Sequence, residues 1–139
     1  MGRQKTAVKN VLILGIGSDI GVALAEQYAN EGYAVTGTYR HIGSVNGLLA
    51  NRAIRLIRCD IGSKSSIRES VDKYKKSSKP WDVFISCVGS MEPIGKFFTC
   101  DFDKWEQSVL VNSISQLRFL YEIYPSWRFL PFFPLTLHG

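Results

Sequence analysis

Three glycines within residues 11–21, VLILGIGSDIG, are the residues whose type and spacing point most directly to chemistry. Gly15, Gly17 and Gly21 follow a short apolar run without charge, and helix-forming residues come next. This order is typical of a buried parallel strand, a tight turn and a helix N-terminus, with Ser18 as the expected N-cap. Such a turn aims unpaired backbone N–H groups and the positive end of a helix dipole at one point. It therefore predicts a phosphate-binding site.

Three more residues with useful chemistry, Arg40, Asp60 and Gly89, each closely follow a later apolar run. In open α/β sheets, ligands bind beyond the carboxyl ends of the strands, which is where these residues are expected to lie. The planar guanidinium of Arg40 can bind a phosphate through two hydrogen bonds, and His41 could assist.

Apolar runs and helical patterns alternate along the chain, and these elements must position the residues named above. The apolar runs predict strands at residues 11–14, 34–39, 54–59 and 82–87. The helical patterns predict helices at residues 20–31, 44–50, 63–76 and 103–124. This alternation predicts an α/β fold, a Rossmann-like parallel sheet with helices on both faces and the strand order 3-2-1-4.

The glycine turn resembles the TGxxxGxG loop of the short-chain dehydrogenase/reductase family. Leu14 stands where that pattern has threonine, Gly15 and Gly21 match its glycines, and Asp19 replaces the middle one. The Asp19 carboxylate suits the helix dipole, but it suits a nearby pyrophosphate only if the side chain turns outward.

The resemblance implies a nicotinamide dinucleotide as cofactor. An acidic residue after the second strand would hold a ribose 2′-OH, whereas Arg40 suits a 2′-phosphate, so NADP is expected over NAD. Asp60 matches an aspartate that contacts the adenine amino group in this family. The residues that the resemblance assigns to cofactor binding are Gly15, Gly17, Ser18, Asp19, Ile20, Gly21, Arg40, Asp60, Ile61, Cys87, Val88 and Gly89.

At the end of the fourth predicted strand, Ser86-Cys87-Val88-Gly89 stands where the family usually has Asn-Asn-Ala-Gly. Cys87 and Val88 are small enough to line a ribose pocket. The absence of both asparagines is expected to weaken the support of the central sheet.

The long helix predicted at residues 103–124 carries the most specific match. Trp105 and Asn112 are seven residues apart, as are the tryptophan and the active-site asparagine of the family. The resemblance therefore implies that Asn112 is catalytic. Val109, Leu117 and Leu120 are expected to form an apolar helix face together with Trp105.

The proton-transferring residues of the family have no counterpart in this chain. They are a serine after a fifth strand and a Tyr-x-x-x-Lys pair, whereas none of the six tyrosines here has a lysine four residues later. Since a general acid or base contributes roughly 10²–10⁴-fold, little or no turnover is expected from this chain. We expect the family fold to stop after the helix at 103–124, as in a truncated or frame-shifted enzyme.

Residues 125–139 differ from the preceding domain at residues 1–124. They are rich in proline and phenylalanine and predict an irregular C-terminal tail. The fourth strand would then be an exposed sheet edge and the long helix would keep an uncovered apolar face. Both invite association, so a homo-oligomer formed through that helix is expected.

Composition narrows the setting of the protein. Three cysteines without metal-ligand spacing predict reduced thiols, no metal site and a cytoplasmic location. No apolar run reaches the roughly 18 residues of a membrane span. The net charge of +5 includes lysines near the end of one helix, which favour a solvated helix end over nucleic-acid binding.

Two functions remain open. The first is an NADP-preferring oxidoreductase of the short-chain type, acting on a small carbonyl or alcohol once its catalytic residues are supplied. The second is a non-catalytic nucleotide-binding or interaction module. A sugar-nucleotide epimerase would require GxxGxxG, and Ser18 breaks that pattern.

Overall fold

A four-stranded parallel sheet forms the centre of the molecule, in a computed structural model that describes residues 9–130. The strands are β1 (Asn10–Leu14), β2 (Ala34–Tyr39), β3 (Ile54–Arg58) and β4 (Val83–Ser86). Their order is β3-β2-β1-β4, so the predicted Rossmann-like α/β fold and strand order are confirmed.

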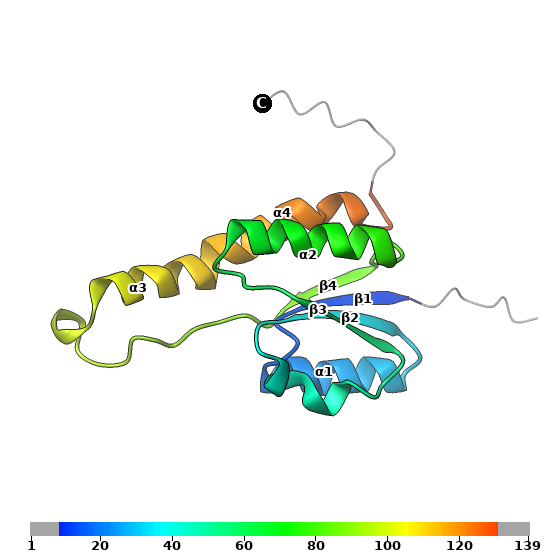
Figure 1. Cartoon of the computed structure of the whole chain (residues 1–139), viewed down its shortest axis with the longest axis horizontal. Helices are drawn as coiled ribbons and strands as arrows, with labels where there is room; N and C mark the ends of the chain where they lie inside the picture. The colour runs from blue at the N-terminus through cyan, green and yellow to red at the C-terminus, as the bar shows by residue number, and fades with distance from the viewer. Residues whose placement is uncertain (1–8, 131–139) are drawn as a thin grey trace, which may run out of the picture.

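Helices cover both faces of the sheet (Figure 1). Helix α1 (Asp19–Asn30) and the 3₁₀ helix η1 (Ile42–Leu48) lie on one face, and α2 (Lys64–Ser77) and α4 (Ser115–Ile123) lie on the other. Because strand side chains alternate, Val11 and Ile13 enter the core beneath α1, while Leu12 and Leu14 enter the core beneath α2 and α4. All four are buried, which explains why β1 has an unbroken apolar sequence.

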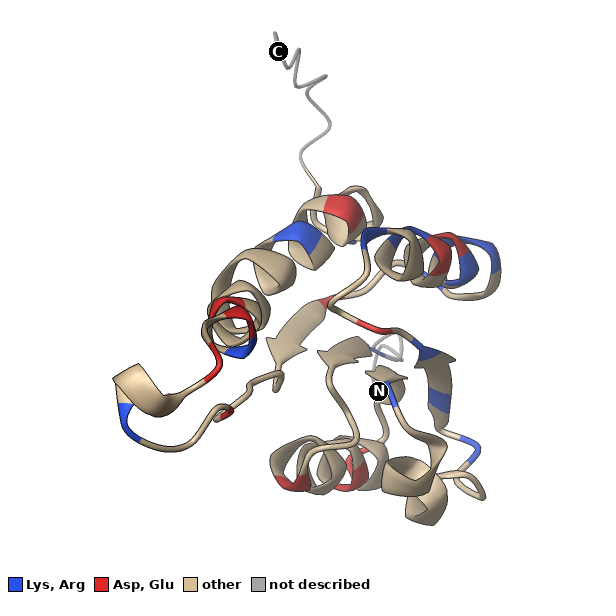
Figure 2. Ribbon diagram, turned by 60° about the vertical axis from the view of Figure 1, so that its left-hand side comes forward, with Lys and Arg blue, Asp and Glu red and all other residues tan. Residues whose placement is uncertain are grey.

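The predicted element boundaries are correct to within a few residues. Helix α1 begins at Asp19 with Ser18 as its N-cap, and the Ser18 hydroxyl accepts the Gly21 N–H at 3.0 Å. Ser63 caps α2 in the same way, and Lys75 and Lys76 lie in its last turn. Figure 2 shows these and other basic residues on α2 and along the outer strand β3. The helix predicted at residues 44–50 is instead the 3₁₀ helix η1, whose two glycines weaken any longer α-helix.

The long helix predicted at residues 103–124 consists of three segments. They are α3 (Phe102–Val109), the π-helical segment η3 (Leu110–Ile114) and α4. Trp105, Val109 and Leu117 of the predicted apolar face are exposed, whereas α4 buries Phe119 and Ile123 against the sheet. Only the C-terminal part of the helix packs on the sheet, and α3 extends beyond it (Figure 1). Which residues are buried therefore depends on the docking of α4.

The first residues after α4 pack against the start of β4. A 3₁₀ turn, η4 (Tyr124–Ser126), leads into a parallel bridge between Trp81 and Trp127. The Trp81 N–H donates to the Ser126 carbonyl at 3.0 Å, and the Arg128 N–H donates to the Trp81 carbonyl at 2.9 Å. This part of the segment predicted to be irregular thus pairs with the chain just before β4. Residues 131–139 of that predicted tail lie outside the described residues.

Candidate functional site

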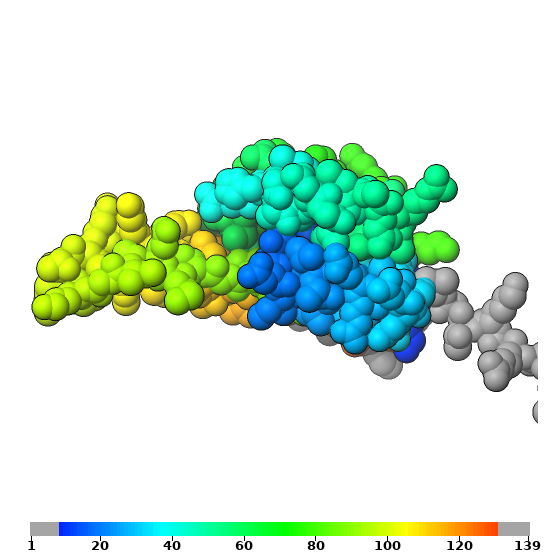
Figure 3. All heavy atoms as spheres, turned by 90° about the horizontal axis from the view of Figure 1, so that it is seen from below, coloured from blue at the N-terminus to red at the C-terminus, as the bar shows by residue number. Residues whose placement is uncertain are grey.

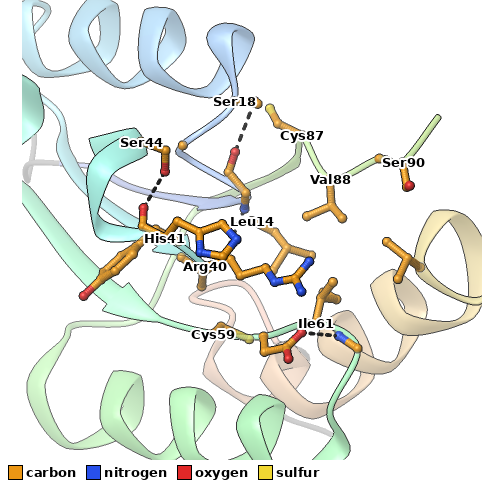
Figure 4. Close-up of a pocket in the computed structure, with 18 of the residues that line it drawn as sticks. Leu14, Ser18, Arg40, His41, Ser44, Cys59, Ile61, Cys87, Val88 and Ser90 are labelled. Carbon is orange, nitrogen blue, oxygen red and sulfur yellow. Dashed lines mark hydrogen bonds between the residues drawn. The ribbon is translucent and has the colours of Figure 1, made fainter. Parts of the chain in front are cut away.

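A cavity of about 780 Å³ lies beyond the carboxyl ends of the strands (Figure 4). Its walls come from the glycine turn after β1, the ends of β2 and β3, the loop after β4 and one side of α3. This is the place where open parallel sheets bind ligands, and the volume is that of a typical small-molecule site.

The glycine turn combines close backbone packing with unused N–H groups. Gly15 has φ +80°, and its N–H donates to the Thr38 hydroxyl at 3.1 Å. The Ser18 N–H and hydroxyl both donate to the Gly15 carbonyl, at 3.3 and 3.2 Å. The N–H groups of Gly17, Asp19 and Ile20 have no acceptor within residues 9–130. Three donors at a helix N-terminus are therefore available to an anion.

The glycines are required because neighbouring backbone and side chains leave no room for a Cβ. A Cβ at Gly15 would lie 2.8 Å from Val88 Cγ2, and one at Gly17 would overlap the Ser44 hydroxyl. A Cβ at Gly21 would lie 2.6 Å from the Gly15 carbonyl oxygen. Gly15 and Gly17 therefore shape the cavity, whereas Gly21 lets α1 pack closely under the turn.

Arg40, at the end of β2, brings a positive charge to the cavity mouth. Figure 4 shows its side chain extending toward Ile61, which follows the neighbouring strand β3. Within residues 9–130, the ion pairs are Arg68–Glu122 and Arg128–Asp82, so Arg40 has no carboxylate partner there. His41 and Ser44 lie beside it in the cavity wall, and the Ser44 hydroxyl donates to the His41 carbonyl at 2.7 Å.

Asp60, after β3, is fixed in position by its neighbours. Its backbone N–H donates to the Ser66 hydroxyl at 2.8 Å, and its carboxylate accepts the Gly62 N–H at 3.0 Å. Asp60 and Ile61 both line the cavity. Asp60 therefore presents an acceptor on the wall that faces the glycine turn.

The residues after β4 form the third wall, which Figure 4 shows through Cys87, Val88 and Ser90. The Cys87 N–H donates to the Leu14 carbonyl at 2.8 Å and continues the β1–β4 pairing. Burial raises the pKa of the Cys87 thiol, and burial likewise raises the pKa of the Cys59 thiol in the cavity floor. Both side chains therefore present neutral thiols at neutral pH.

Asn112 lies at the edge of this wall, inside the π-helical segment η3. Its Oδ1 accepts the Ser90 N–H at 2.6 Å, and its Nδ2 donates to the Ser90 carbonyl at 2.8 Å. The residue implied to be catalytic is thus brought to the site, but its side chain is bonded to the loop after β4 and does not line the cavity.

Most of the residues assigned to cofactor binding line the same cavity. They are Gly15, Gly17, Ser18, Arg40, Asp60, Ile61, Cys87, Val88 and Gly89. Asp19, Ile20 and Gly21 do not. Ile20 is 69% exposed, and Asp19 is also exposed.

Sequence reasoning missed one wall of the cavity, formed by Lys104, Gln107, Ser108 and Val111 of the long helix. Their spacing of i, i+3, i+4 and i+7 marks one helix face, but the spacing does not tell which face meets the cavity. Thr38 was also missed. It precedes the end of β2, and its buried hydroxyl supports the Gly15 N–H.

Neither a metal site nor a membrane-spanning helix is found in the described part of the chain. Residues 9–130 hold no group of three histidine, cysteine or acidic side chains arranged to bind a metal ion. No helix in this part is both long enough and apolar enough to cross a bilayer.

Comparison with known proteins gives a match over most of the chain. Residues 15–128 match a family model described as enoyl-(acyl carrier protein) reductase. Protochlorophyllide reductase of Pisum sativum, a chloroplastic protein, is 27% identical over 119 residues. That match covers 81% of this chain but only 30% of the pea protein.

Solved structures share the fold. A short-chain type dehydrogenase/reductase from Mycobacterium ulcerans superposes with a TM-score of 0.72 at 24% identity, over 85% of this chain and 46% of that one. A short-chain dehydrogenase/reductase from Burkholderia multivorans with bound NADP gives 0.76 at 19% identity, over 87% and 55%. The chain thus spans about half the length of these structures and about a third of the pea protein. From the match over residues 15–128, the chain belongs to the short-chain dehydrogenase/reductase family.

Proposed function

We propose that this chain is the NADP-binding part of a short-chain oxidoreductase. The observation that carries the proposal is that one cavity is lined both by the glycine turn, where the Gly17 N–H is unused, and by Arg40, which has no carboxylate partner within residues 9–130. The first suits a diphosphate and the second suits the 2′-phosphate that distinguishes NADP from NAD. The Burkholderia multivorans relative, solved with NADP, supports the same assignment.

The residues present fit a nicotinamide dinucleotide. The glycine turn leaves no Cβ between the backbone and an anion, Asp60 offers an acceptor to an adenine amino group, and Cys87 and Val88 provide an apolar wall for a ribose. When bound, the nicotinamide supplies hydride exchange with a carbonyl or alcohol. The chain's own residues bind and orient it, and Asn112 holds the loop beside it.

Titration of the purified protein with NADPH and NADH, followed by nicotinamide fluorescence, tests the proposal. We expect saturable binding with NADPH bound more tightly. At a ligand concentration 100 times the dissociation constant, NADPH should add roughly 2.7 kcal/mol to the free energy of unfolding. Absence of a thermal shift with both nucleotides would contradict the proposal.

We further propose that the substrate of the complete reaction is a small carbonyl or alcohol, and that the 139-residue chain alone turns it over slowly or not at all. No tyrosine in the sequence is followed four residues later by lysine. A panel of aldehydes and ketones with NADPH measures this. Rapid reduction of any of them by the chain alone would refute the second half of the proposal.

A non-catalytic interaction module is the second candidate, and the long helix favours it. Phe102, Trp105, Val109, Leu117 and Tyr121 are exposed along α3 and α4. Figure 3 shows the segment around α3 projecting from the body of the molecule. We propose that this helix surface pairs with a second copy of the chain, as its apolar character would favour burial.

Nucleic acid and membrane are not proposed as partners. The free thiols Cys59, Cys87 and Cys100 support a cytoplasmic location.

A further inference from the structure

The loop after β4 is held to the long helix by two side-chain amides, one helical turn apart. Asn112 bonds both the N–H and the carbonyl of Ser90. Gln116 lies four residues after Asn112 on the helix. Its Nε2 donates to the carbonyl of Val88, two residues before Ser90, at 3.0 Å. Two helix residues four positions apart, Asn112 and Gln116, thus bond two loop residues two positions apart, Ser90 and Val88.

Gln116 uses both ends of its amide. Its Oε1 accepts the Ser86 hydroxyl at 2.6 Å while its Nε2 bonds Val88. The same Nε2 lies 3.2 Å from the Val111 carbonyl, which belongs to the π-helical segment η3. Gln116 therefore connects the last residue of β4, the loop beyond it and the irregular turn of the helix.

Val88, whose carbonyl Gln116 bonds, packs directly against the glycine turn. A Cβ on Gly15 would lie 2.8 Å from Val88 Cγ2 and 3.1 Å from the Val88 N atom, so the two backbones are as close as a glycine allows. A shift of Val88 would therefore change the shape of the cavity at the point where the turn presents its N–H groups. Gln116 itself does not line that cavity.

We infer that Gln116 is a positioning residue, which holds Val88 against the glycine turn through Ser86 and the Val88 carbonyl. The inference rests on the proposed function for its effect on NADPH, but the contact itself can be tested without any nucleotide.

The test compares Gln116→Leu with Gln27→Leu, an α1 variant whose amide bonds only Glu31 on its own helix. Because Val88 would no longer be held against the glycine turn, Gln116→Leu should raise the dissociation constant for NADPH about tenfold. Hydrogen exchange in residues 88–90, measured at the Ser90 amide that donates to Asn112, should also quicken, while exchange in β1 and β2 stays unchanged. Gln27→Leu should alter neither measurement.

Two more variants sharpen the result. Gln116→Glu keeps the size of the side chain but places an oxygen against the Val88 carbonyl, so it should behave like Gln116→Leu. Ser86→Ala should weaken NADPH binding in the wild-type background and add nothing to Gln116→Leu, since both act through one contact.

Several outcomes would overturn the inference. One is a Gln116→Leu protein whose NADPH affinity and whose exchange at residues 88–90 both match wild type. Another is faster exchange spread evenly over all four strands, which would mark a general loss of stability. If wild type binds neither NADPH nor NADH, the proposed function fails, and the exchange at residues 88–90 still decides whether Gln116 holds the loop.

Discussion

Arg128 and Asp82 form an ion pair at 3.0 Å between the segment after α4 and the residue that precedes β4. The Asp82 side chain is only 4% exposed, and its Oδ2 also accepts the Asn10 N–H at 2.7 Å. One carboxylate therefore joins the start of β1, the start of β4 and the last described segment. The bridge between Trp81 and Trp127 lies directly beside it.

Removing the positive partner should destabilise the fold. Arg128→Leu leaves the Asp82 charge buried without its cation, and we expect the free energy of unfolding to fall by about 3 kcal/mol. Arg68→Leu is the control, because the Arg68 side chain is 67% exposed and lies 4.0 Å from Glu122, and it should change stability by less than about 0.5 kcal/mol. Urea denaturation measures both. If the two variants lowered the free energy of unfolding equally, the Arg128–Asp82 pair would stabilise the fold no more than the exposed pair does.

Arg40→Ala should weaken the binding of NADPH much more than the binding of NADH. Loss of a guanidinium that bonds a phosphate costs about 1.5–3 kcal/mol, so the affinity for NADPH should fall roughly 10- to 100-fold while that for NADH changes little. Arg58→Ala, at the end of the neighbouring strand and outside this cavity, serves as the control. Equal losses of NADPH and NADH affinity would exclude a 2′-phosphate role for Arg40.

Gly21→Ala should act on the fold more than on the ligand. The new Cβ would meet the Gly15 carbonyl oxygen at 2.6 Å, and overpacking of this kind costs about 1–3 kcal/mol. Gly47→Ala is the matched control, since a Cβ there has no neighbour within 4 Å. Thermal unfolding compares the two. A Gly21→Ala protein as stable as wild type would show that α1 can move away from the turn at little cost.

High pH should destabilise the protein through its buried thiols. Burial raises the pKa of Cys59 and Cys87 in the folded state, whereas the unfolded thiols titrate at about 8.5. Below that pH both states are protonated and the thiols have no effect. Above it the unfolded state loses protons first, so the free energy of unfolding falls as pH rises. Urea titrations between pH 7 and 10 should show a shallower fall for Cys59→Ala. The same slope in both proteins would refute this cause.

The exposed helix surface should control self-association. Leu117 is 63% exposed, and Leu117→Glu places a charge in the middle of that surface. If the helix pairs with a second copy, sedimentation equilibrium should show a lower average mass for this variant. Leu49→Glu, at a site 57% exposed directly after η1, should leave the mass unchanged. A monomeric wild-type protein would contradict the proposed pairing.

The site could be predicted from the sequence where its chemistry is local. Gly15, Gly17 and Ser18 lie in one short turn whose backbone shape depends on its own residues, and Arg40 and Asp60 follow strands with clear apolar patterns. The side wall formed by the long helix could not be predicted in the same way. Lys104 and Gln107 reach the cavity only because α3 extends past the sheet at the angle that the docking of α4 sets.

The family, the parallel sheet and the glycine turn could all be inferred from the sequence alone, because strand runs, glycines and helix caps act over a few residues. The packing of the folded chain, in contrast, determines that Phe119 and Ile123 are buried in place of Leu117, that Gln116 bonds Ser86 and Val88, and that Arg128 meets Asp82. These contacts join residues 28 to 46 positions apart, and their partners are chosen by how α4 and the following segment pack on β4. Contacts between residues so far apart in the sequence produce no periodic pattern or fixed spacing from which they could be predicted.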